Sequence, residues 1–330
     1  VVQSGGGVLL SAGGKHVHAN VMGSGGDLYS LFVNTSSTCS SRDPVVDDDM
    51  IDVINADAAT PWRAGRNARF EGMTMHEAKQ MMGTHLSPLG RPSAVRSPVP
   101  TKTHLPTNFT AQAKWPDCVH PVRNQGQCGS CWAFGASEAL SDRLCIATHN
   151  KTNVVLSPED LVSCDKTDHG CAGGWLLPAW DFMSNTGLVS DACFPYAAVN
   201  GTADQCATSC SDGEAFTPHR ADVKSLEYYG TEAAIMQAIY ESGPIEAAFN
   251  VYSDFMNYKS GVYVQTSKQL MGGHAIKIVG WGHDEASGLD YWQVYNSWGT
   301  SWGMDGQFWI RRGTNECGIE YNSIWGMPLV

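Results

Sequence analysis

The chain has 330 residues, of which 42% are hydrophobic and 16% charged, and its formal net charge is −12. This composition can build a large core and excludes a wholly disordered chain, and the length predicts about two folded units. The acidic balance argues against nucleic acid as a partner, because nucleic-acid binding depends on basic side chains that neutralise phosphates. No run of about 18 apolar residues occurs, so we predict no membrane span.

Cysteines and glycosylation acceptors point to the secretory pathway. The chain has 11 cysteines, a density that favours disulfides and an oxidising compartment, and the odd number leaves at least one thiol unpaired. Asn-X-Ser/Thr acceptors, which act only on the secretory route, begin at Asn34, Asn108, Asn150 and Asn200. We predict a protein of the secretory pathway, whose destinations include the lysosome, the vacuole and the extracellular space.

The amino-terminal third contains three segments of different character. Residues 1–54 are rich in Gly, Ser and Asp without a sustained apolar period, so we predict mostly loop or disorder there. From Trp62 to about Met82, methionines and alanine recur at near-helical spacing, which predicts a helix. Five prolines between Leu86 and Pro106 predict an extended linker that contains a domain boundary.

Beyond this linker, predicted helices come first and predicted strands second. The segment from Cys131 to about Ala147 is apolar around most of its circumference, which predicts a buried helix. Ser157 and Pro158 start another helix, and Leu226 to Tyr240 predicts a further amphipathic one. Five later runs predict strands: AAFNVY, GVYVQ, HAIKIVGW, YWQVYN and QFWIRR. This segregated order indicates an α+β protein with two lobes.

The strongest chemical signal is GQCGSCW at 126–132. An ordinary cysteine is mostly protonated at pH 7, so a nucleophilic cysteine needs a neighbouring cation or a helix dipole. Cys131 opens the predicted buried helix, where the partial positive charge of the N-terminus stabilises a thiolate. His274, 143 residues later on a predicted strand, would supply the imidazolium and protonate the leaving amine.

Three further residues complete the predicted catalytic apparatus. Asn296 would accept a hydrogen bond from the imidazole, and Trp298 would shield that bond from water. Gln125 is placed to donate its side-chain N–H to an oxyanion, beside the backbone N–H of Cys131. We predict no metal and no other cofactor.

One alternative treats Cys128 and Cys131 as a C-x-x-C pair, either a thiol-disulfide oxidoreductase motif or half of a zinc site. A second Cys/His pair at metal spacing is missing from the sequence, and so is a βαβ pattern around the motif. Both absences disfavour this alternative.

These motifs, together with GGHAIKIVGWG at 272–282 and YNSWGTSWG at 295–303, resemble those of cathepsin B-like members of the papain family of cysteine proteases. The resemblance implies a papain-like fold with a helical lobe around a long central helix and an antiparallel β-barrel lobe. It implies a cysteine endopeptidase made as a zymogen. A catalytically silent binding protein on the same fold is the other alternative.

The resemblance also implies how the chain is divided. Residues 1–54 would be an unmatched leader, residues 55–104 an inhibitory propeptide, and residues 105–330 the peptidase domain. The propeptide would cross the active-site cleft backwards, with about Met82 to Leu89 over Cys131. The implied partners are protein and peptide substrates, the propeptide itself and cystatin-like inhibitors, and the implied oligomeric state is a monomer.

Four disulfides follow from the resemblance: Cys118–Cys145, Cys128–Cys171, Cys164–Cys206 and Cys193–Cys210. Cys131 then remains as the nucleophile, Cys317 as a buried free thiol, and Cys39 in the leader.

Substrate-binding residues carried over from the family are Gly173, Gly174, Trp175, Ala275, Trp298 and Asn322. Members with dipeptidyl carboxypeptidase activity have adjacent histidines in an occluding loop, but the stretch between Tyr196 and Cys206 has none, so we predict an endopeptidase. Asn322 stands where a glutamate would accept arginine, and a neutral amide cannot compensate a buried guanidinium. An apolar preference at that subsite follows.

Charge suggests how the propeptide is held. Residues 62–104 contain seven basic and two acidic side chains, whereas residues 105–330 contain 12 basic and 24 acidic ones. We hypothesise that the propeptide docks partly by charge, and that acid loosens it by protonating carboxylates of the enzyme.

Overall fold

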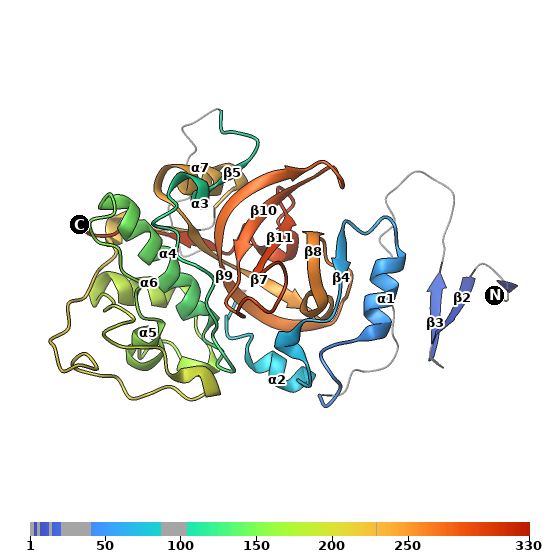
Figure 1. Cartoon of the computed structure of the whole chain (residues 1–330), viewed down its shortest axis with the longest axis horizontal. Helices are drawn as coiled ribbons and strands as arrows, with labels where there is room; N and C mark the ends of the chain where they lie inside the picture. Colours follow the sequence, from blue (N-terminus) through green and yellow to red (C-terminus); the bar gives the residue numbers. More distant parts are fainter. Residues whose placement is uncertain (1–2, 5–6, 13–14, 21–40, 87–103, 229) are drawn as a thin grey trace.

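Two lobes make up the folded part of the chain (Figure 1). The computed structural model describes residues 41–86, 104–228 and 230–330, and the backbone of three short strands before them, β1 (Gln3–Ser4), β2 (Gly7–Ala12) and β3 (Lys15–Asn20). Helices α4, α5 and α6 gather in one lobe, and the long strands curl around each other in the second. The predicted α+β class is confirmed.

The helices vary widely in length. Their bounds are α1 (Asp48–Ala56), α2 (Met75–Gln80), α3 (Ala111–Lys114), α4 (Cys131–Ala147), α5 (Pro158–Cys164), α6 (Leu176–Asn185) and α7 (Glu232–Ser242). Over the residues that the structure describes, none of them combines the length and the apolar character needed to cross a membrane.

Helix α4 is the centre of the helical lobe, and its bounds match the predicted ones. Every residue from Cys131 to Cys145 is buried, as expected for a helix that is apolar on all sides. It packs against α5 and α6 of its own lobe and against β7 and β9 of the other. The first residue of α4 therefore lies where the two lobes meet.

The other two predicted helices differ in outcome. Helix α5 starts as predicted, because the Ser157 hydroxyl accepts a hydrogen bond from the N–H of Asp160 at 3.1 Å and Pro158 occupies the first turn. Helix α7 starts at Glu232, six residues later than predicted. The residues expected to open it, Glu227–Tyr228, instead form the strand β6, which pairs with β12 from the end of the chain.

The second lobe is built on one large sheet with the order β4-β8-β11-β10-β9-β7-β12-β6, and β5 pairs with β9 beside this path. The bounds are β4 (Trp62–Ala64), β5 (Phe109–Thr110), β6 (Glu227–Tyr228), β7 (Ile245–Tyr252), β8 (Tyr258–Tyr263), β9 (Leu270–Asp284), β10 (Leu289–Tyr295), β11 (Gln307–Arg311) and β12 (Ser323–Trp325). The five predicted runs lie in β7 to β11.

The pairings in this sheet are antiparallel, as the resemblance implies, except for one. Strands β8 and β11 pair in parallel, with Trp309 opposite Val262. The reason lies in the connection: β9 and β10 separate the two strands in the chain, so they are not joined by a hairpin.

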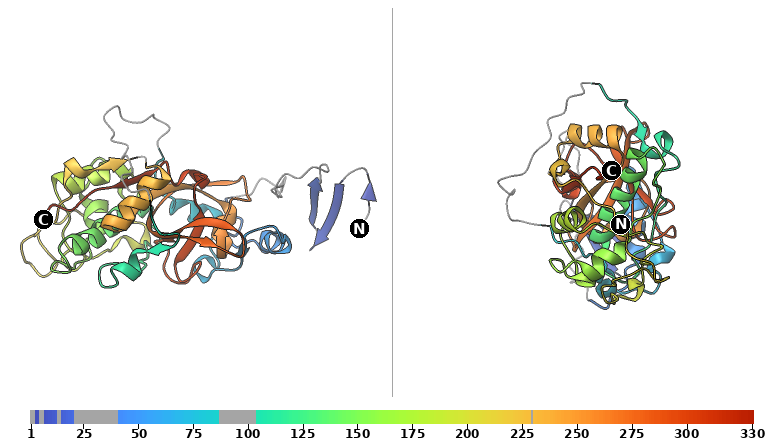
Figure 2. Two further views of the ribbon diagram at one scale, coloured as in Figure 1. Left: turned by 90° about the horizontal axis from the view of Figure 1, so that it is seen from above. Right: turned by 90° about the vertical axis from the view of Figure 1, so that its left-hand side faces the viewer.

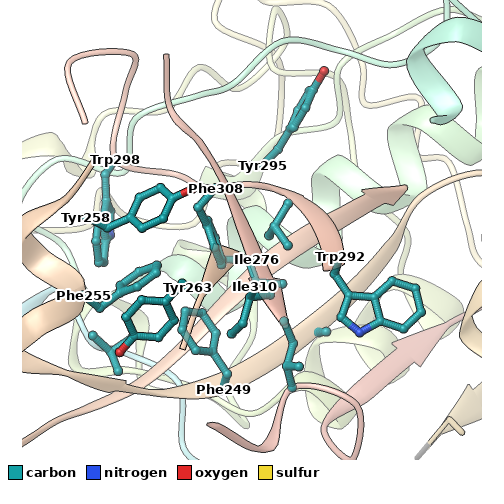
Figure 3. Packing of buried hydrophobic residues seen from close by; sticks show 14 of the residues in the cluster. Phe249, Phe255, Tyr258, Tyr263, Ile276, Trp292, Tyr295, Trp298, Phe308 and Ile310 are labelled. Carbon is teal, nitrogen blue, oxygen red and sulfur yellow. The ribbon is translucent and has the colours of Figure 1, made fainter. Parts of the chain in front are cut away.

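Aromatic side chains fill the core of the sheet lobe (Figure 3). The ring centroid of Phe255 lies 4.9 Å from those of Tyr263 and Phe308 and 5.0 Å from that of Trp302. All four residues are completely buried. Removing such a ring typically costs about 3–5 kcal/mol, so this cluster is a major contributor to the stability of the lobe.

Helix α1 corrects the prediction that residues up to 54 are loop or disorder. Asp47 caps it by accepting a hydrogen bond from the N–H of Met50 at 3.0 Å, and Ile51 and Ile54 are buried beneath it. The aspartates that contribute to the prediction of disorder instead supply the N-cap, Asp47, and a favourably charged first turn with Asp48 and Asp49. The predicted leader boundary at residue 54 thus falls inside a helix.

The helix expected from Trp62 to Met82 is also wrong. Trp62–Ala64 is the strand β4 on the edge of β8, Ala68–Phe70 is a short 3-10 turn, and only Met75–Gln80 is α-helical. A strand partner far along the chain decides the structure here, and local periodicity contains no information about it. Most of the predicted proline-rich linker, as well as Cys39, lies outside the described residues.

A buried ion pair connects the two lobes. Lys277 on β9 is buried, and its ammonium donates to Asp142 Oδ2 on α4 at 2.8 Å and lies 3.6 Å from Glu138 Oε2. Burial lowers the pKa of Lys277, but the two carboxyl groups outweigh it and the net shift is upward. The pair fixes β9 against α4 and so holds the two sides of the cleft in register.

Figure 2 shows the two lobes side by side, with β1–β3 beyond the sheet lobe.

Candidate active site

The predicted nucleophile and its histidine come from opposite lobes. Cys131 is the first residue of α4, and His274 lies on β9. Cys131 packs against Ala275, the neighbour of His274, and against Ala248 of β7. All of these residues are completely buried. The fold therefore places the start of a helix, with its partial positive charge, directly beside the strand that carries the imidazole.

His274 is oriented by Asn296, as predicted from the sequence. The imidazole Nε2 lies 2.7 Å from Asn296 Oδ1, which also accepts the N–H of Ser297 at 2.8 Å. Because that oxygen is an acceptor, Nε2 carries the proton. The Trp298 ring lies 4.7 Å from the imidazole and is completely buried, so it excludes water from the bond. The other nitrogen, Nδ1, has no hydrogen-bond partner among the described residues.

Gln125 is completely buried, and both ends of its side chain are fixed. Its Oε1 accepts the hydroxyl of Ser297 at 2.7 Å, which leaves the Nε2 group as donor. Nε2 donates to the carbonyl of Cys128 at 2.8 Å and to the carbonyl of Met81 at 2.9 Å. The Met81 carbonyl of the amino-terminal segment thus accepts a hydrogen bond from Gln125 Nε2, the group that we expect to donate to an oxyanion.

The amino-terminal segment crosses between the two lobes over Cys131. It is bonded to the helical lobe by the Gly174 N–H, which donates to the Gly83 carbonyl at 2.8 Å, and by the His85 N–H, which donates to the Gly174 carbonyl at 2.9 Å. On the sheet lobe, the Thr84 N–H donates to the Gly273 carbonyl at 3.0 Å. Both bridges are parallel. The expected crossing segment is about 82–89, and residues 82–86 of it are described by the structure.

Comparison with known families gives a clear result at this point. A model of the papain family cysteine proteases matches residues 105–327, and a model of the peptidase family C1 propeptide matches residues 46–88. The chain belongs to the papain family of cysteine proteases.

Relatives place this protease near cathepsin B. It is 44% identical over 271 residues to the cathepsin B-like CP3 of Giardia intestinalis, which covers 80% of this chain and 89% of that protein. Cathepsin B of Dictyostelium discoideum is 40% identical over 264 residues, and the match covers 76% of this chain and 83% of that protein. The solved procathepsin B S9 from Trypanosoma congolense superimposes with a TM-score of 0.79 at 33% identity and covers 87% of this chain and 100% of its own. The protein is a cathepsin B-like cysteine protease zymogen with its propeptide.

In this zymogen the propeptide covers the Cys131 thiol and keeps it in its uncharged form. The Thr84 hydroxyl lies 3.1 Å from the Cys131 sulfur. Burial raises the pKa of the Cys131 thiol, although the Thr84 hydroxyl and nearby backbone N–H groups oppose that rise. Burial also lowers the pKa of His274 to about 4, against the effect of the bond to Asn296. Thiol and imidazole are therefore both neutral near pH 6, and the ion pair required for attack is absent.

Apolar contacts, more than charge, hold the described propeptide. Arg66 pairs with Asp48 and Glu71 of the propeptide itself, and Arg69 reaches the enzyme at a backbone carbonyl, that of Gly126, at 2.6 Å. By contrast, Phe70 is completely buried, with its ring 5.3 Å from that of Trp298. Among the described residues, neither Arg66 nor Arg69 pairs with a carboxylate of the enzyme, so these two side chains give no support to the hypothesis of docking by charge.

The cysteines exclude the redox interpretation of the motif. Cys128 is bonded to Cys171, so it does not pair with Cys131. The other three bridges also match those implied by the resemblance: Cys118–Cys145, Cys164–Cys206 and Cys193–Cys210. Cys131 and Cys317 are free, as the resemblance implies, but Cys317 is half-buried rather than buried. Four bridges fit an oxidising compartment.

Leu86 of the propeptide packs against a small apolar cluster at Cys131, which we call the apolar pocket. The cluster contains Ala275, which the resemblance assigned to substrate binding, and two residues that the sequence did not single out, Leu176 and Ala248. Asn322 adjoins this pocket, because its carbonyl accepts the N–H of Ala248 at 2.8 Å. Trp175 instead faces the preceding propeptide residue, His85, at a ring distance of 4.5 Å. Of the predicted substrate residues, Ala275 and Asn322 therefore lie at the apolar pocket and Trp175 lies against His85, whereas Trp298 covers the imidazole of His274.

Proposed function

We propose that the processed protease is a cysteine endopeptidase in which Cys131 and His274 form a thiolate-imidazolium pair. The thiolate attacks the substrate carbonyl carbon, His274 gives its proton to the leaving amine, and water then hydrolyses the thioester. Asn296 keeps the imidazole oriented, and Gln125 with the Cys131 N–H stabilises the oxyanion. The supporting observation is the His274–Asn296 bond beside a peptide chain that lies across Cys131.

Covalent labelling of Cys131 tests this proposal. An epoxysuccinyl inhibitor should label Cys131 only after acid incubation and removal of the propeptide, and labelling should abolish hydrolysis of a peptide substrate. A processed protein that neither reacts with the inhibitor nor hydrolyses peptides would be a silent binding protein, and the proposal would be wrong.

We expect internal cleavage rather than release of carboxyl-terminal dipeptides. The short loop after Tyr196 lies against the active-site segment, since the Val199 carbonyl accepts the N–H of Gln127 at 2.8 Å, and it contains no histidine to bind a substrate carboxylate. Mass spectrometry should show that a peptide with an amidated carboxyl end is cut at the same internal bonds as the free acid. A product series dominated by dipeptides from the free acid would contradict this.

The apolar pocket predicts substrate preference at the second residue before the cut. Leu86 fills this pocket in the zymogen, and the Asn322 amide donates to the Gly318 carbonyl at 2.8 Å, so no carboxylate is offered to arginine there. We expect kcat/KM for a Phe-Arg fluorogenic substrate to exceed that for Arg-Arg by about tenfold or more. Asn322→Glu should raise the Arg-Arg value by about tenfold, with Asn322→Gln as the neutral control. Equal values for both substrates in the unaltered protease would contradict the prediction.

The same reasoning extends to processing and location. Helix α1 contacts β4, and the propeptide family model matches from residue 46, so we infer that the propeptide includes α1 rather than starting at residue 55. Cleavage between the described segments 41–86 and 104–228 would release the cleft. Acidic processing and a lysosomal, vacuolar or extracellular location are consistent with the disulfides. Cystatin-like inhibitors remain expected partners of the opened cleft.

A further inference from the structure

The propeptide adds a strand to the edge of the protease sheet. Strand β8 pairs with β11 on one side and with the propeptide strand β4 on the other (Figure 1). In β4, Trp62 lies opposite Gly261 and Arg63 opposite Ser260 in antiparallel register. When the propeptide leaves, β8 becomes an edge strand whose backbone groups are free to pair with another chain.

A tryptophan anchors this added strand. Trp62 is 1% exposed, and its indole N–H donates to the Val264 carbonyl at 3.0 Å. Its ring lies 5.3 Å from that of Tyr263 and 6.0 Å from that of Tyr258. All three of these contact residues belong to the protease part of the chain, so they remain after processing.

Backbone complementarity extends on both sides of the tryptophan. The Val262 N–H donates to the Pro61 carbonyl at 3.1 Å, and the Gly65 N–H donates to the Asn257 carbonyl at 2.7 Å. Gly261 makes the approach feasible: its φ is +87°, and a Cβ there would lie 2.5 Å from the Pro61 oxygen. Backbone hydrogen bonds of this kind recognise any extended segment, whereas the contacts around the Trp62 ring recognise one side chain.

The protease keeps the shape of this surface by its own contacts. The Tyr258 hydroxyl donates to the Gly261 carbonyl at 2.6 Å and accepts the Trp309 N–H at 3.2 Å. The ring of Phe255 packs behind it, 6.1 Å away in a stacked arrangement. A surface fixed from behind in this way needs little reorganisation to bind a new segment.

We propose that residues 256–264, here called the β8 edge site, form an exosite of the processed protease. Its occupant is an extended segment of a protein substrate that carries a tryptophan, followed by one exposed residue and then a small residue, as in Trp62, Arg63 and Ala64. This goes beyond the proposed catalytic function, since the exosite recognises substrate away from the bond that is cut. Binding there raises the local concentration of the substrate at the cleft.

The first experiment measures binding without catalysis. A Cys131→Ala full chain is cut by an added site-specific protease at a recognition sequence inserted between Ser87 and Thr103, and the propeptide is then removed. A fluorescein-labelled peptide of residues 59–67 is titrated by fluorescence anisotropy. We expect binding, with Kd at least about tenfold weaker for the Trp62→Ala peptide. The matched Arg63→Ala peptide, altered at an exposed position, should bind within about twofold.

The second experiment uses the active, processed protease. An unstructured protein substrate extended by residues 59–67 should be cut with kcat/KM about tenfold higher than the same substrate carrying the Trp62→Ala tag. The peptide alone should not inhibit hydrolysis of a dipeptide substrate. Absence of binding, equal binding by the Trp62→Ala peptide, or competition with the dipeptide substrate would each overturn the exosite. The anisotropy titration uses an inactive Cys131→Ala protein, so it tests the exosite even if the proposed catalytic function is wrong.

Discussion

Alkylation of Cys131 by iodoacetamide at pH 6 is expected to be roughly 100-fold slower in the zymogen than in the processed protease. Thiolate is the species that reacts with iodoacetamide, so the rate follows the fraction of Cys131 that is ionised. In the zymogen, burial raises the pKa of the Cys131 thiol. A raised thiol pKa lowers the thiolate fraction at every pH below it, so the sign of the effect is a slower reaction.

The histidine strengthens this difference. Burial lowers the pKa of His274 to about 4 in the zymogen, so the imidazole is neutral at pH 6 and offers no positive charge to a thiolate. Removing the propeptide exposes both groups to water, and an imidazolium can then stabilise the thiolate. The alkylation rate of the zymogen should therefore rise only at alkaline pH, whereas the processed protease should stay reactive into the acid range.

Peptide mass spectrometry of the alkylated protein separates the two free thiols. Cys317 serves as an internal control, because its thiol bonds to the neighbouring Glu316 rather than to a propeptide residue that the structure describes. Burial and Glu316 raise the pKa of this thiol. Its rate should change little on processing. Equal alkylation of Cys131 in zymogen and processed protease would show that the propeptide does not control the nucleophile.

The chemistry of the site was largely readable from the sequence, because it depends on residue types in fixed local contexts. Cys131, His274 and Asn296 each stand in short glycine- and tryptophan-rich motifs. The bond between His274 and Asn296 forms because Asn296 directly follows β10, which pairs with β9. Leu176 and Ala248 were not predicted as pocket residues. Small and aliphatic side chains carry no chemical signal, and only the fold brings them to the cleft.

The propeptide was the least predictable part, for two physical reasons. Trp62 is a strand residue because β8 provides its partner, which no local pattern reveals. Helix α1 did have a local signal, Asp47 as N-cap before Ile51 and Ile54, but the surrounding acidic and glycine-rich composition obscured it. Composition describes the average of a segment, whereas a short helix depends on a few positions.

Gly83→Ala is expected to destroy latency of the zymogen. A Cβ on residue 83 would lie 1.7 Å from the carbonyl oxygen of Gly129 and 2.3 Å from its carbonyl carbon. Gly129 cannot yield, since it follows the disulfide-bonded Cys128 and its N–H donates to the Cys171 carbonyl at 3.1 Å. The propeptide must lift instead, and it loses the contact between Thr84 and the thiol.

The measurement is hydrolysis of a Phe-Arg fluorogenic substrate by the uncut full chain at neutral pH, with Gly83→Ala expected to raise the rate by about tenfold or more. Gln80→Ala is the matched control, because Gln80 is exposed and lies in the same segment, and it should leave the zymogen latent. After processing, the two variants yield the same protease as the unaltered chain, so equal kcat/KM values at that stage exclude misfolding. A Gly83→Ala zymogen as inactive as the unaltered one would mean that the cleft accommodates the methyl group, and that the close approach of residues 83 and 129 is not what keeps the propeptide in place.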